Sequence, residues 1–255
     1  MTLADQSYSP DRSLKGKFRR RWARRVVRRP LELALDHPIV SVTFDDAPLS
    51  AVETGAEVLE RYGARGSYYV CAGLEGRPGH MGNYAQMADY AALAERGHEI
   101  ACHTFSHLDC GKADAAEIQA DIERNTDALS RIDVQAIHFA YPYGDVSPQA
   151  KRALSGRYGS LRALHPGLIR QGTDLNQLPA VGIEGPEGEA HARGWIDRAL
   201  AERAWLILYT HDVRENASDW GCTPAALDRL VQRALAGGAR LATVGAVLAS
   251  HERPL

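Results

Sequence analysis

The sequence lacks any long apolar run, although 45% of its 255 residues are hydrophobic. A membrane-spanning helix needs about 20 consecutive, mostly apolar residues, so none is expected. The N-terminus also lacks the charged-then-apolar pattern of a secretory signal, because its basic stretch runs into Pro30 with no apolar segment behind it. If Met1 is the native start, we expect a cytoplasmic protein, with peripheral attachment at the inner membrane face as a further option.

Cysteines are few, and they do not form a recognisable motif. Cys71, Cys102, Cys110 and Cys222 show no CxxC spacing and no dense framework. Since disulfides are uncommon in the cytoplasm, we expect four reduced thiols, most of them buried. We also find no linker, low-complexity tract or internal repeat, so residues 31–255 are expected to form one domain.

The net charge of the chain is small, but the charged residues are unevenly distributed. The net charge is −2, yet residues 12–29 hold ten Lys or Arg and no acid. The rest of the chain therefore has 20 basic residues against 32 acidic ones, a balance of −12. An acidic body argues against nucleic-acid binding as the main function.

The basic segment has an apolar stripe. Leu14, Phe18, Trp22 and Val26 recur every four residues among arginines, which predicts an amphipathic helix in an N-terminal arm of residues 1–30. The stripe could pack on the domain and leave the basic face in solvent. Alternatively, residues 14–29 could contact anionic lipid as an interfacial helix.

After the arm, predicted strands and helices alternate. Repeated β-then-α units indicate a parallel sheet covered by helices, and seven or eight units favour a barrel over an open sheet without deciding between them. The predicted strands are 39–44, 67–71, 98–102, 136–140, 159–163, 178–181, 205–209 and 240–241, and the predicted helices are 50–62, 84–96, 114–132, one starting at 147–148, 187–201, one from 223–224 to 237–238, and 243–250.

Ionisable residues follow three of the predicted strands. Asp45 and Asp46 come after the first strand, His103 and His107 after the third, and His211 after the apolar strand that begins at Trp205. In parallel α/β folds the carboxyl ends of the strands share one face, where sites are built. These five side chains are therefore expected to converge.

The residue types suit metal-assisted hydrolysis. His103 and His107 are four apart, so one helical turn would place both rings on one face. Two histidines and a carboxylate are a common catalytic zinc set that leaves a position for water. The adjacent aspartates can supply one ligand and one general base, and His211 can protonate the leaving amine.

Four motifs resemble the polysaccharide deacetylase family, also called carbohydrate esterase family four. They are TFDD, HTFSH, FAYPYG and the strand ending in His211, and they occur in the family's order. The resemblance implies an α/β fold, a distorted (β/α)7-type barrel. It also implies that Asp45 is the base, that Asp46, His103 and His107 bind one divalent ion, and that His211 is the acid. Zinc is the expected ion, with cobalt or another divalent ion as alternatives.

The third motif departs from the family. Many members have Arg-x-Pro-Tyr, whose arginine orients the base, whereas this chain has Ala140 at that position. The Asp–Trp motif that supports that arginine is also not evident. Another basic residue could substitute, and Arg170 is one candidate. By resemblance, the Pro142–Tyr143 turn contributes an oxyanion-binding backbone amide, and Trp220 either stacks on a sugar ring or packs in the core.

The sequence therefore predicts a metal-dependent hydrolase that removes an N-acyl group, with acetyl preferred, from an amino sugar or glycan. One alternative is a non-glycan amidohydrolase acting on a ureide, imide or small amide. Another is a catalytically silent glycan-binding relative, suggested by Ala140.

Overall fold

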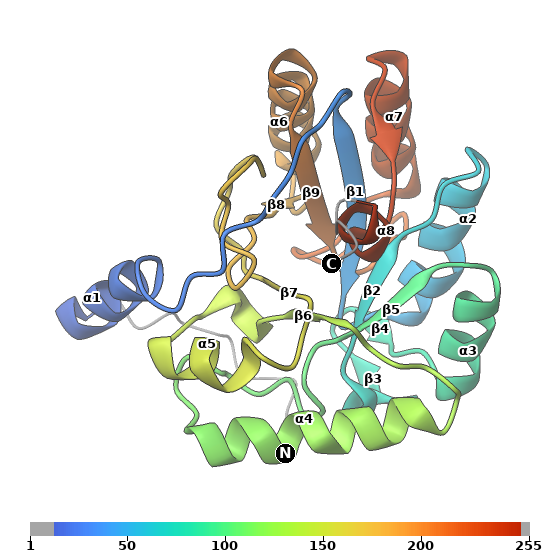
Figure 1. The fold of residues 1–255 in the computed structure, drawn as a ribbon. Coiled ribbons are helices and arrows are strands. Elements are labelled where there is room, and N and C mark those ends of the chain that lie inside the picture. The colour runs from blue at the N-terminus through green and yellow to red at the C-terminus, as the bar shows by residue number, and fades with distance from the viewer. Residues whose placement is uncertain (1–12, 251–255) are drawn as a thin grey trace.

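A computed structural model describes residues 13–250, in which a curled parallel sheet carries helices on its outside (Figure 1). The eight-stranded sheet has the order β7-β6-β5-β2-β1-β9-β8, with β10 paired to β1. All pairings between these strands are parallel, as the alternation of strands and helices predicted. The strands are β1 (Ile39–Asp45), β2 (Ser67–Val70), β5 (Glu99–Cys102), β6 (His138–Ala140), β7 (Ser160–Arg162), β8 (Val181–Gly182), β9 (Trp205–Thr210) and β10 (Arg240–Leu241).

Strand β1 is the centre of the sheet. All seven of its residues are buried, as expected for a parallel strand covered on both faces. It pairs with β9 from Ile39 to Phe44 and with β2 from Thr43 to Asp45. Phe44 stacks on Tyr68 of β2 at 4.6 Å between ring centroids, so the strand that carries the aspartates is fixed by packing on both sides.

The sheet curls into an incomplete barrel. Strands β7 and β8 are its two ends, and the segment between them lies along β7 through hydrogen bonds of Leu161 with the backbone of Leu175 and Leu178. The strand predicted at 178–181 is thus reduced to β8, because Leu178 makes only an isolated bridge to Arg162. The distorted-barrel prediction is confirmed, and the curl brings the carboxyl ends of distant strands together.

The helices follow the predicted alternation with small changes in their ends. Asp114 and Glu117 form a capping box at the start of α4, and Ser147 and Thr223 cap α5 and α7 ahead of a proline. The predicted helix 50–62 is a π-helical turn, η1 (Ala51–Gly55), followed by a short α2. The helices are α2 (Ala56–Glu60), α3 (Met87–Glu95), α4 (Ala115–Ser130), α5 (Pro148–Leu154), α6 (Gly188–Glu202), α7 (Pro224–Ala236) and α8 (Val244–Ala249). No helix among residues 13–250 combines the length and apolarity needed to cross a membrane.

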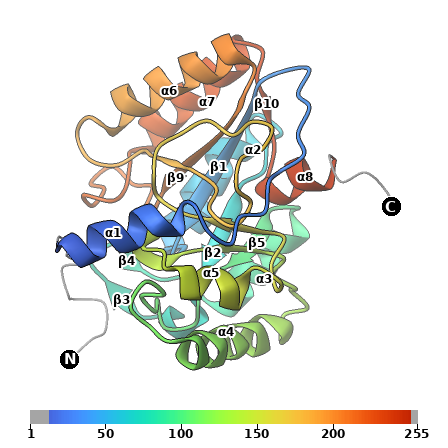
Figure 2. The same cartoon turned by 60° about the vertical axis from the view of Figure 1, so that its left-hand side comes forward.

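The N-terminal helix α1 (Leu14–Ala23) lies at one side of the molecule, beside α5 (Figures 1 and 2). The interpretation in which its aromatic residues pack on the domain is wrong. The side chains of Phe18 and Trp22 are 68% and 49% exposed. The helix instead faces the domain with Gly16 and Ala23, which are both buried.

Candidate active site

The two aspartates at the end of β1 face different partners. Asp45 is the last residue of the strand, and Asp46 and Ala47 then adopt positive φ of 57° and 45°. Successive side chains of a strand point to opposite faces, so this left-handed turn is what allows adjacent carboxylates to serve the same site. Both residues are almost fully buried.

His103 and His107 meet across a loop, and the expectation of a shared helical turn is wrong. Residues 103–107 are non-helical, with φ of 65° at Thr104 and 57° at His107. The buried carboxylate of Asp121 holds the loop by accepting hydrogen bonds from the backbone amides of Phe105 and Ser106 at 2.7 and 3.0 Å. The two imidazoles lie 5.1 Å apart between ring centroids.

Asp46 lies between the two imidazoles. Its Oδ1 is 3.8 Å from Nε2 of His103 and 3.5 Å from Nε2 of His107. Ligand atoms at about 2.0–2.2 Å from one tetrahedral zinc are separated by roughly this distance. Nδ1 of His103 donates to the carbonyl oxygen of Ala140 at 2.8 Å, which leaves Nε2 as the atom turned towards Asp46.

The protonation states suit a metal centre. Burial, against the attraction of both aspartates, lowers the pKa of His103 to about 4, so the ring is neutral, which is the form that binds a metal. Burial would raise the pKa of Asp46, but the neighbouring His107 and His103 hold it below its usual value. A divalent ion therefore fits this donor set.

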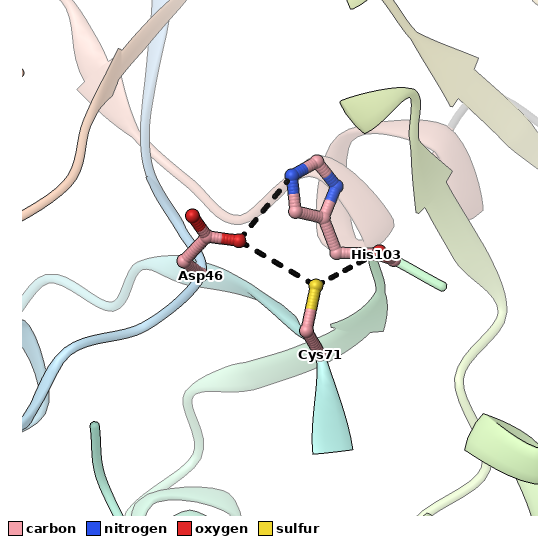
Figure 3. Close-up of side chains that lie close together, drawn as sticks. All are labelled: Asp46, Cys71 and His103. Atoms are coloured by element: carbon pink, nitrogen blue, oxygen red, sulfur yellow. Dashed lines mark hydrogen bonds and ion pairs between the residues drawn. The ribbon is translucent and has the colours of Figure 1, made fainter. Parts of the chain in front are cut away.

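Cys71 is an additional donor that we did not predict. Its Sγ lies 3.5 Å from Oδ1 of Asp46 and donates to the carbonyl oxygen of His103 at 2.9 Å (Figure 3). Ligand atoms of Asp46, Cys71 and His103 all lie within 4.8 Å of one another. Its position directly after β2, at the edge where the other strands end, was a usable signal in the sequence.

Arg162 is the cation beside Asp45. Its Nη2 is 2.5 Å from Oδ1 of Asp45, and both side chains are buried. Its guanidinium also lies over the rings of Tyr69 and Tyr209, at 4.7 and 5.5 Å. Burial disfavours the cation, but the charge of Asp45 raises the pKa of Arg162 above its ordinary value.

The suggestion that Arg170 replaces the missing arginine is wrong. Arg170 forms an ion pair with Glu202, and the two side chains are 49% and 41% exposed. Arg162 on β7 is paired in register with Ala140 on β6. The arginine of this chain therefore lies one strand away from the position at which many members of the family carry theirs. A charged residue inside a predicted buried strand, 159–163, was the signal that pointed to it.

His211 is positioned by Glu184, a residue that sequence reasoning missed. Nδ1 of His211 is 3.2 Å from Oε1 of Glu184 and 3.1 Å from the carbonyl oxygen of Trp220. Burial lowers the pKa of His211, but Glu184 and the two aspartates outweigh it and raise the pKa to about 9. Glu184 follows the short strand β8, which makes its strand-end position hard to recognise in the sequence.

The remaining predicted residues lie beside this cluster. Tyr143 has φ of 59° in the turn η3 (Pro142–Gly144), and its ring is 4.3 Å from the ring of His107. Pro142 is buried. Trp220 is 47% exposed and packs edge-on against His80 at 5.1 Å, so the core interpretation of Trp220 is wrong.

Comparisons with known proteins point to one family. The sequence model of the family described as "Polysaccharide deacetylase" matches residues 33–158. A chitin deacetylase of Arthroderma benhamiae is 27% identical over 113 residues, which are 40% of this chain and 28% of that protein. A probable peptidoglycan-N-acetylglucosamine deacetylase of the same fungus is 27% identical over 115 residues, or 43% of this chain and 24% of that protein. The matched segments thus span about a quarter of these relatives.

Solved structures share the fold over most of the chain. The CE4 domain of a multidomain xylanase from the hindgut metagenome of Trinervitermes trinervoides has a TM-score of 0.61 at 18% identity, covering 84% of this chain and 91% of that one. The chitin deacetylase of Colletotrichum lindemuthianum has a TM-score of 0.59 at 18% identity, covering 85% and 90%. With the family match and the arrangement of the motif residues, these likenesses lead to one conclusion: the chain belongs to the polysaccharide deacetylase family.

Proposed function

We propose that this protein is a metal-dependent hydrolase that removes an N-acyl group, with acetyl preferred, from an amino sugar or glycan. The observation that carries the proposal is the meeting of two charge systems at one edge of the sheet. One is the Asp46–His103–His107 cluster, and the other is Asp45 held by Arg162.

In the proposed reaction Asp46, His103 and His107 hold one divalent ion, with zinc expected and cobalt or another ion as alternatives. When bound, such an ion makes water more acidic and polarises the acyl carbonyl. Sulfur is a soft donor that favours zinc among these ions, and Cys71 adds a sulfur atom beside Asp46.

The protein's own groups would carry the protons. Asp45, whose carboxylate is held in place by Arg162, is proposed to accept the proton of the attacking water. His211, with a pKa of about 9, is protonated at neutral pH and donates its proton to the leaving nitrogen. The backbone amide of Tyr143 is proposed to stabilise the oxyanion.

The substrate class rests on the relatives and on the exposed aromatic residue near the site. Two of the similar proteins are a chitin deacetylase and a probable peptidoglycan-N-acetylglucosamine deacetylase. The partly exposed ring of Trp220 beside the loop of His211 could stack on a sugar ring. The proposed partner is therefore an acetylated amino sugar or glycan, without a role for nucleic acid.

The alternative amidohydrolase on a ureide, imide or small amide would use the same groups. The silent glycan-binding alternative is less well supported, because Arg162 supplies the cation that Ala140 lacks. We also propose that the protein works in the cytoplasm, which agrees with four free, buried cysteines.

The test is metal content together with acetate release from a panel of N-acetyl sugars, with cyclic amides as the competing panel. Asp45→Asn should retain metal and lose turnover, and His191→Ala, a change at an exposed position, should match wild type. Turnover of cyclic amides without acetate release would select the non-glycan alternative. Wild-type protein that binds metal but turns over neither panel would contradict the proposed reaction.

A further inference from the structure

The outward face of α1 is aromatic and is held in that orientation. Phe18 and Trp22 are stacked, with 6.3 Å between ring centroids and 7° between ring planes. Both are substantially exposed, whereas Ala23, the next residue, is fully buried. Contiguous exposed apolar patches rimmed by polar residues mark interaction surfaces.

Three polar contacts fix this helix to the domain. Arg19 donates to the carbonyl oxygen of Gly111 and to the buried carboxylate of Asp145, both at 2.5 Å. The buried ammonium of Lys151 donates to the carbonyl oxygen of Ala23 at 2.8 Å. These contacts hold α1 in the orientation that leaves Phe18 and Trp22 exposed.

The anchoring points belong to the loops of the candidate active site. Gly111 lies four residues after His107, and Asp145 lies two residues after Tyr143. Arg19 therefore links α1 to the segment that follows His107 and to the segment that follows the turn η3. A partner bound to α1 would consequently be held near the candidate active site.

The charge around the aromatic pair selects the partner. Residues 12–29 carry ten Lys or Arg and no acid, while the rest of the chain has a balance of −12. Arg21, Arg24, Arg25 and Arg28 are exposed in and directly after the helix. Aromatic rings combined with cations are the signature of helices that lie in the interface of an anionic bilayer.

We propose that α1 and the arginines that follow it form a docking surface for an anionic lipid bilayer, with Phe18 and Trp22 entering the headgroup region. A second copy of this chain fits less well, because two such basic segments would repel each other. The inference goes beyond the proposed reaction, and binding can be measured without turnover.

The experiment is co-sedimentation of the full chain with vesicles of phosphatidylcholine alone or with phosphatidylglycerol. We expect binding only to the anionic vesicles, and a steep loss at about 0.5 M salt, where the Debye length is only about 4 Å. Phe18→Ser with Trp22→Ser should weaken binding at least about tenfold. Arg21→Gln and Arg24→Gln should each weaken it by about fivefold.

Ile137→Ser is the matched control, since Ile137 is a 58% exposed apolar residue outside α1 and its loss should leave binding unchanged. Brominated lipid should quench tryptophan fluorescence on binding, and Trp22→Phe should remove most of this quenching. Equal binding by wild type and the Phe18/Trp22 variant would overturn the proposal. So would a dimer in light scattering that the same variant dissociates, because α1 would then bind a second copy.

Discussion

Arg162→Met tests the reasoning about the candidate site most directly. The substitution keeps a long apolar stem but removes the cation that touches Asp45 at 2.5 Å, in a place where both side chains are buried. Removing one partner of a buried ion pair typically costs about 3–5 kcal/mol, because it leaves the other charge without compensation. Since small proteins are stabilised by only about 5–15 kcal/mol, denaturant unfolding should detect the loss easily.

The double variant separates this explanation from a packing defect. Arg162→Met combined with Asp45→Asn leaves no unpaired charge, so its free energy of unfolding should be higher than that of Arg162→Met alone. The cycle of single and double variants measures the coupling between the two groups. Additive losses would mean that the ion pair contributes nothing beyond the packing of each side chain.

The turnover of the Arg162→Met variant should fall together with its stability. Without Arg162, Asp45 loses the partner that orients its carboxylate, so turnover should fall roughly a hundredfold. Moving the cation back, with Ala140→Arg in an Arg162→Ala background, should restore part of the activity, because the two positions are paired across β6 and β7. A folded, metal-containing Arg162→Met protein with wild-type turnover would refute the assigned role.

Further predictions concern protons and metal. Turnover should fall as the pH rises through about 9, the pKa of His211, and Glu184→Gln should move this alkaline limb to lower pH in a pH–rate profile. Because the pKa of His211 is raised by folding, its contribution to the stability of the metal-free protein is complete below about pH 6.5 and is lost as the pH rises through about 9. In thermal unfolding, Glu184→Gln should therefore be destabilised relative to wild type by more at about pH 6 than at about pH 10. An equal loss of stability at the two pH values would contradict this explanation. His103→Ala should reduce bound metal from about one ion per chain to nearly none by elemental analysis, and the absence of metal from wild type after addition of zinc or cobalt would contradict the ligand set.

The sequence by itself determined most of the strands and helices and which motif residues meet at the candidate site. The β-branched run of 39–44 and the apolar run that begins at Trp205 could only be buried strands, and both form the centre of the sheet. Residues directly after such strands must lie at one edge of a parallel sheet. For that reason Asp45, Asp46 and the two histidine motifs could be grouped before any coordinates.

Contacts between distant segments were decided only by the tertiary structure. Arg162 reaches Asp45 because β7 lies beside β6 and the sheet curls, whereas the sequence had suggested Arg170. Glu184 and Cys71 join the site for the same reason, since neither has a motif of its own. The loop of His103 and His107 also depends on tertiary structure, because Asp121 on α4 supplies its hydrogen bonds.

The orientation of α1 shows the same division. Its four-residue periodicity specified an amphipathic helix, but periodicity cannot say which face is buried when both faces have long side chains. Small residues, Gly16 and Ala23, face the domain, and the ion pair of Arg19 with Asp145 fixes the rotation. Local sequence determines the helix, while packing and charge pairing across more than a hundred residues determine what the helix presents to its surroundings.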